Sequence, residues 1–180
     1  MVHSASLRWT LALLIAVSLC ASCGSSGSSK ISPASYVRAV CAAISPLERD
    51  VVARSQAVNK PSPSATKAKE TLQGFLAAIE QASNRALSGI QSAGTPDISN
   101  GSAVAGTIVK AFTQLRDAIH TAGAKANSLP MNSPSTYSAA AQALNTSVRS
   151  SLSNIDASGF RNPDIEKAAA KEPACKTLSA

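Results

Sequence analysis

Aromatic and metal-binding side chains are scarce in this sequence. Aromatic residues make up 3% of it, and its only tryptophan is Trp9. Of its two histidines, only His120 lies beyond the first few residues. A metal site needs several His, Cys or carboxylate ligands at a regular spacing, and the sequence shows no such spacing. We therefore expect neither a metal nor a cofactor.

Strand patterns and catalytic motifs are missing as well. Val and Ile never form the alternating runs that a sheet requires. There is no P-loop, no G-x-G-x-x-G after a strand and no G-x-S-x-G. His120 has Asp117 one helical turn before it, but a general base also needs a nucleophile nearby. We predict that His120 lies on an exposed helix surface and that the protein is not an enzyme.

Basic residues outnumber acidic ones, but they do not cluster. The 17 Lys and Arg against 10 Asp and Glu give a net charge of +7. No block of five or six like charges occurs, and no basic stripe or nucleic-acid-binding motif is present. Nucleic acid is therefore not an expected partner. The basic bias is that of a solvated surface, or it attracts the chain to anionic envelope polymers or lipid head groups.

The N-terminal region has the layout of an export signal. Arg8 precedes an uncharged, largely apolar run of 11 residues, 9–19. That run is too short to cross a hydrocarbon core of ~30 Å, and its length is typical of a signal peptide. Small residues then lead to Cys23, and the Gly/Ser-rich residues 24–29 predict a flexible tether. We assign residues 1–22 to the signal peptide.

The residues around Cys23 resemble the lipobox of bacterial lipoproteins. Ala21, Ser22, Cys23 and Gly24 match its last part, while Cys20 stands where leucine is usual. The resemblance implies a thioether-linked diacylglycerol on Cys23. Residues 23–32 would then be the lipidated cysteine and its tether, and the chain would sit on the extracytoplasmic face of the cell membrane. Ordinary secretory cleavage near the same place is the alternative.

Two cysteines remain once Cys20 leaves with the signal and Cys23 takes lipid. Cys41 falls on the apolar face of the first expected helix, and Cys175 lies near the C-terminus. Disulfides persist in exported proteins, so we predict a Cys41–Cys175 bond that holds the C-terminal tail on the first helix. The alternative is two free thiols.

The rest of the chain, 33–180, predicts one all-α domain. Alanine is the best helix former, and apolar residues recur at helical spacing. Ser-Pro pairs at 32–33 and 133–134 are helix starts. The expected helices are 33 to the breaker at 60–64, about 64–92, about 102–128, 133 to a cap at Gly159, and a short one from 162 to about 171, stopped by Pro173.

These helices predict an up-down-up-down four-helix bundle with a short fifth C-terminal helix. In the first helix the apolar stripe continues in register past Pro46, through Val51 and Val58, which predicts a kink there and not an end. Each long helix has one aromatic residue, which either packs in the core or forms a ligand box; the four are Tyr36, Phe75, Phe112 and Tyr137.

The lipobox, the Ala-rich helices, the YVxxVC segment at 36–41 and the G-x-P-D-I-x-x-G loop at 94–101 together resemble small exported lipoproteins of actinobacteria. That resemblance implies location and fold. The leading hypothesis is a non-enzymatic, membrane-anchored envelope lipoprotein that binds a protein or envelope-polymer partner. The alternative is a carrier of an apolar ligand held between the helices. A carrier predicts a cavity above about 300 Å³ beside Phe75 and Phe112.

Overall fold

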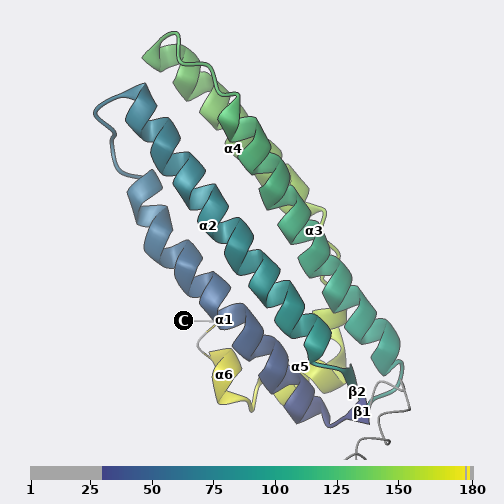
Figure 1. Ribbon diagram of the computed structural model, residues 1–180. Helices are drawn as coiled ribbons and strands as arrows, with labels where there is room; N and C mark the ends of the chain where they lie inside the picture. Colours follow the sequence, from purple (N-terminus) through teal and green to yellow (C-terminus); the bar gives the residue numbers. More distant parts are fainter. Residues whose placement is uncertain (1–29, 177, 179–180) are drawn as a thin grey trace, which may run out of the picture.

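The computed structural model describes residues 30–176 and 178, and it is mostly helical, as predicted (Figure 1). The expected signal peptide, Cys23 and the tether lie outside these residues. The elements are β1 (Lys30–Ile31), α1 (Pro33–Val58), α2 (Ala65–Ser92), β2 (Thr95–Pro96), α3 (Gly101–Asn127), α4 (Pro134–Ser153), the 3-10 turn η1 (Ser158–Arg161), α5 (Pro163–Ala169) and α6 (Pro173–Lys176).

The predicted helix starts are confirmed in atomic detail. The side-chain oxygens of Ser32, Ser64 and Ser133 each accept a hydrogen bond from the backbone N–H three residues later, at 3.1, 3.2 and 3.1 Å. Each bond satisfies one of the N–H groups that the first turn of a helix leaves without a partner. Proline at the first position of α1 and α4 loses no hydrogen bond there.

A two-residue parallel strand pair joins the start of the described chain to the far end of α2. Lys30 pairs with Thr95 and Ile31 with Pro96, and the N–H of Asp97 donates to the Ile31 carbonyl at 2.7 Å. This contact was not predicted, because two residues are too few to show alternation. It fixes Lys30 and Ile31 at the end of the molecule where α2 finishes (Figure 1).

The predicted helix ends near the C-terminus are partly wrong. Helix α4 ends at Ser153, and Gly159 does not cap it. Gly159 lies buried in η1, against α3, so closely that a Cβ there would come within 2.8 Å of Ile108 Cγ1. The short helix α5 ends at Ala169, close to the expected end at about 171, and Pro173 in addition starts α6, because a proline is tolerated at a helix N-terminus.

The helices enclose two apolar cores, one above the other along the long axis. The first lies between α1, α2 and α3, and η1, α5 and α6 cover it. The second lies between α2, α3 and α4 at the other end, and none of its described residues belongs to α1. Helix α4 packs along α3. The last turns of α1 therefore lie beside the second core without closing it.

This arrangement overturns one prediction for α1. The helix continues through Pro46, as expected. Beyond it, however, Val51 is 37% exposed and Val52 is 59% exposed. Val51 was expected in the buried stripe, but α4 packs along α3 and leaves this half of α1 partly open to solvent. Val58, at the end of the stripe, is half-buried.

Candidate functional site

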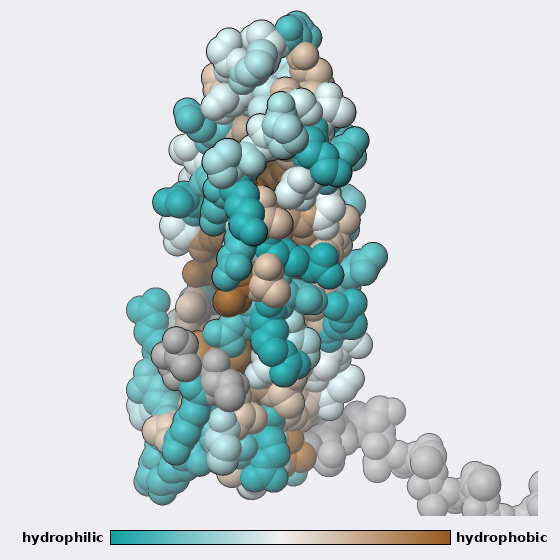
Figure 2. All heavy atoms as spheres, turned by 90° about the vertical axis from the view of Figure 1, so that its left-hand side faces the viewer, coloured by the Kyte–Doolittle hydropathy of each residue, from teal (hydrophilic) through white to brown (hydrophobic). Residues whose placement is uncertain are grey.

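A groove of about 930 Å³ opens where α1 fails to cover the second core. The last turn of α1 and the α1–α2 loop form one wall, the first three turns of α2 form the floor, and α4 forms the other wall. Figure 2, which faces the α1 side, shows apolar atoms recessed among polar side chains on this face. The apolar residues of the lining are Ala57, Val58, Ala68, Leu72, Phe75, Leu76, Tyr137, Ala141, Leu144 and Val148.

The apolar lining follows from helical spacing. On α2, Ala68, Leu72 and Phe75 lie on one face because residues three or four apart are neighbours on a helix. On α4 the same spacing places Tyr137, Leu144 and Val148 on one face, and this face lines the groove. Several of these side chains also pack in the second core, so the core extends into the groove. The result is an apolar surface that solvent can reach from one side.

The rim of the groove is polar and carries charge of only one sign. Among the described residues that line it, the charged ones are Lys60, Lys67 and Arg149, and none is a carboxylate. Lys67 pairs with Glu70, which lies outside the groove, at 3.2 Å. Arg149 Nε donates to the Asn145 amide oxygen at 2.9 Å, a neutral partner.

Lys60 has no hydrogen bond or ion pair with any residue in 30–176 or with 178. It stands in the α1–α2 loop, in a stretch that the sequence marked only as a helix breaker. The composition of that loop gave no sign that its lysine would face a hollow, because the position of α4 decides this.

The four aromatic residues do not form one ligand box. Phe75, which is half-buried, and the largely buried Tyr137 both line the groove, while Tyr36 and Phe112 lie in the first core. Phe112 was expected beside a cavity with Phe75. Instead it lies in the first core, with its ring edge-on to Phe160 at 6.3 Å between centroids. The cavity considered from the sequence therefore lies beside Phe75 but not beside Phe112.

His120 lies outside the groove, on the surface shared by α2 and α3. Its Nδ1 lies 2.8 Å from a Glu80 carboxylate oxygen, and its side chain is 71% exposed. Asp117, the partner considered from the sequence, accepts from Arg116 instead. A hollow of about 240 Å³ lies beside His120, and neither serine nor cysteine is among its described lining residues.

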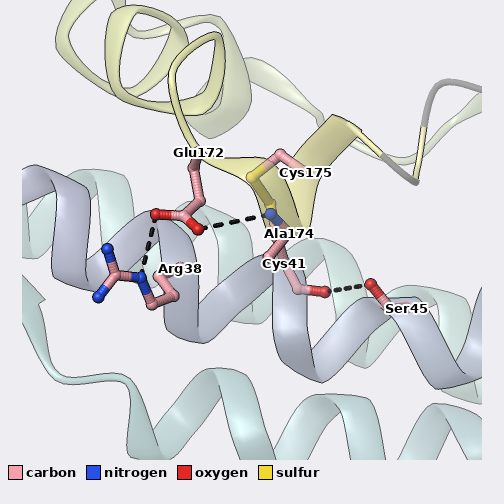
Figure 3. The surroundings of a disulfide bond; sticks show 6 residues. All are labelled: Arg38, Cys41, Ser45, Glu172, Ala174 and Cys175. Carbon is pink, nitrogen blue, oxygen red and sulfur yellow. Dashed lines mark hydrogen bonds and ion pairs between the residues drawn. A yellow bond between two sulfur atoms is a disulfide. The ribbon is translucent and has the colours of Figure 1, made fainter.

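Cys41 and Cys175, the predicted pair, are joined by a disulfide with their Cα atoms 5.2 Å apart (Figure 3). Beside it, Arg38 Nε donates to the buried Glu172 carboxylate at 3.1 Å. The other carboxylate oxygen of Glu172 accepts from the Ala174 N–H at 3.4 Å. The bond, the ion pair and this helix-capping contact hold α6 against α1. They lie at the far end of α1 from the groove.

Within residues 30–176 and 178, metal-binding clusters and membrane-crossing helices are both absent. No three His, Cys, Asp or Glu side chains within 30–176 and 178 gather closely enough to share a metal ion. In the same part of the chain, no helix combines the length and the apolar character that a membrane crossing requires.

Comparisons with protein-family models, with curated proteins and with solved structures find no match to this chain.

Proposed function

We propose that this chain is an exported, membrane-anchored envelope lipoprotein that carries an apolar ligand in the groove between α1, α2 and α4. The groove is the observation that supports this proposal. Its volume of about 930 Å³ falls in the range of ligand pockets, and exceeds the cavity of about 300 Å³ expected for a carrier. Its floor is apolar and its rim polar, which is the usual pattern of a small-molecule site.

The bundle arrangement belongs to the same proposal. We take the four long helices as an up-down-up-down bundle that is left open on one side, with α5 as the short fifth helix. In a closed bundle, α4 would cover the distal half of α1. Here the groove takes that place, and Val52 remains 59% exposed beside it. An open side lets a ligand enter without unfolding the second core.

The anchor at Cys23 is supported by the cysteine count. Cys41 and Cys175 are bonded to each other, so the folded domain needs no further thiol. Replacing Cys23 with alanine is expected to move the protein from the membrane fraction to the medium. Immunoblotting of both fractions measures this. A Cys23→Ala protein that stays in the membrane fraction would contradict the anchor.

The ligand proposal is tested by filling the groove. Ala141 lines it, and a phenylalanine there would occupy the space, whereas Ala143 is exposed on the same helix and does not line the groove. The full chain is captured from cells, washed free of detergent and extracted with organic solvent. Mass spectrometry is expected to find apolar molecules with the wild type and Ala143→Phe, and much less with Ala141→Phe. Equal recovery from all three proteins would count against a ligand in the groove.

A partner protein or envelope polymer is the second candidate, and the exposed pair Val51 and Val52 favours it. Crosslinking in intact cells followed by pull-down tests this. A partner that is lost with Val52→Lys and kept with Ala141→Phe would identify the α1 face, and not the groove, as the functional surface.

A further inference from the structure

We propose that the ligand of the groove is an amphiphile with one long acyl chain and an anionic carboxylate head group. This inference rests on the proposed ligand-carrying function and specifies the chemistry of its ligand. The chain would lie along the apolar floor, and the carboxylate at the basic rim.

The charge of the lining carries the inference. All three charged side chains in the described lining are cations, and they come from three different segments: Lys60 in the loop, Lys67 in the first turn of α2 and Arg149 on α4. None of the described lining residues is a carboxylate that could neutralise them. A neutral apolar molecule would leave these cations without any contribution to binding, and a cationic one would be repelled.

Two of these cations are free to accept an anion. Arg149 makes its side-chain hydrogen bond to a neutral amide, Asn145. Lys60 has no charged partner within the described residues. Lys67 is partly occupied by Glu70. A carboxylate entering the groove would therefore meet unpaired positive charge without first having to break a salt bridge to Lys60 or Arg149.

The rest of the surface shows that this charge pattern is local. The smaller hollow between α2 and α3 contains Glu80 together with His120. Asp50 of α1 forms ion pairs with two arginines, Arg54 on the same helix and Arg85 on α2. Net positive charge alone therefore does not explain why the described lining of the groove lacks a carboxylate.

The test compares three probes that share a dansyl-undecanoyl chain and differ in the head: the free carboxylate, its methyl ester and the matching amine. Fluorescence titration of the detergent-free full chain is expected to give the tightest binding for the carboxylate. The variant Lys60→Gln/Arg149→Gln is expected to weaken carboxylate binding by about fivefold, because exposed charge pairs contribute little each. It should leave the ester unchanged.

The matched control is Lys110→Gln/Lys171→Gln, which removes the same net charge from exposed residues outside the groove. It is expected to bind all three probes as the wild type does. If the ester or the amine binds as tightly as the carboxylate, or if both double variants behave alike, the anionic head group is wrong while the apolar carrier stands. If no probe binds and Ala141→Phe has no effect on extracted material, the carrier function itself fails.

Discussion

Tyr36 is a buried polar residue whose hydroxyl has no hydrogen-bond partner among the described residues. Its burial raises the pKa of the phenol from 10.0 to about 12. The ionised form is therefore disfavoured in the folded protein more than in the unfolded chain. The contribution of the neutral Tyr36 phenol to the free energy of unfolding is complete below pH 10, and it is lost as the pH rises through about 12. Burial shifts the pKa of Tyr137 in the same direction.

We expect Tyr36→Phe to keep or raise the stability at pH 7, by up to ~1 kcal/mol, because it removes a buried hydroxyl that nothing satisfies. It should also reduce the loss of stability between pH 7 and about pH 11. Urea unfolding at both pH values measures this, with Tyr137→Phe as the control that retains most of the loss. An undiminished alkaline loss in Tyr36→Phe would show that another group causes it.

Replacing glycine with alanine is expected to have opposite effects on stability at Gly159 and at Gly74. Gly159→Ala would place a methyl group 2.8 Å from Ile108 Cγ1 and 3.1 Å from the Val104 carbonyl oxygen. We expect it to cost about 1–3 kcal/mol, because a packed site has no room to yield. At Gly74, within α2, a Cβ would meet nothing within 4 Å, so alanine should stabilise by about 0.5–1 kcal/mol. Thermal unfolding of both variants tests the pair.

The uncovered half of α1 makes a prediction about this element. Val51→Lys should change the free energy of unfolding by less than about 0.5 kcal/mol, because the side chain can reach water. The same substitution at Val40, which is 4% exposed in the first core, should cost more than about 3 kcal/mol. Chemical denaturation of the two variants measures the difference. A large loss for Val51→Lys would mean that the bundle is closed over α1.

The C-terminal elements depend on their attachment to α1. The disulfide closes a loop with a sequence separation of 134, so its loss should cost about 2–5 kcal/mol. We expect Cys175→Ala/Cys41→Ala to unfold at a lower temperature than the wild type, and limited proteolysis to cut first within 154–176. A double variant as protease-resistant as the wild type would show that Glu172 and Arg38 hold the tail without the disulfide.

The helix starts and the ends of α1, α2 and α3 could be predicted from the sequence, but the end of α4 and the packing partners of the helices could not. Ser32, Ser64 and Ser133 act through bonds within one turn, so local residues are enough to place them. The end of α4 depends on η1 packing against α3, and Gly159 looked like a cap only because that contact is distant in sequence. The exposure of Val51 likewise depends on where α4 packs.

At the scale of the whole molecule, the same limit applies to the site. Val58 was expected on an apolar helix face and Phe75 and Tyr137 in the core or in a ligand box, and a cavity near Phe75 was considered. The position of the groove and its basic rim could not be predicted from the sequence. They arise from the separation between α1 and α4, which no local sequence pattern indicates. The two cores explain that separation: C-terminal elements cover α1 in the first, and nothing replaces them in the second.

The groove and Lys30, the first described residue, lie at opposite ends of the long axis. Lys30 lies where α2 ends, while the groove lies where α2 begins, and 28 helical residues span about 42 Å (Figure 1). If Cys23 carries the lipid, the end of the domain that holds the groove is the one farther along the long axis from Lys30, the first described residue after the anchor.

A fluorophore attached through Lys30→Cys or Ser138→Cys tests this orientation in vesicles that contain a head-group quencher. Both positions are exposed, and Ser138 lines the groove. We expect strong quenching at position 30 and little at position 138, and the difference should disappear with Cys23→Ala, because that protein would not be held at the membrane. Stronger quenching at 138 would place the groove against the bilayer and would mean that the protein takes its ligand directly from the membrane surface.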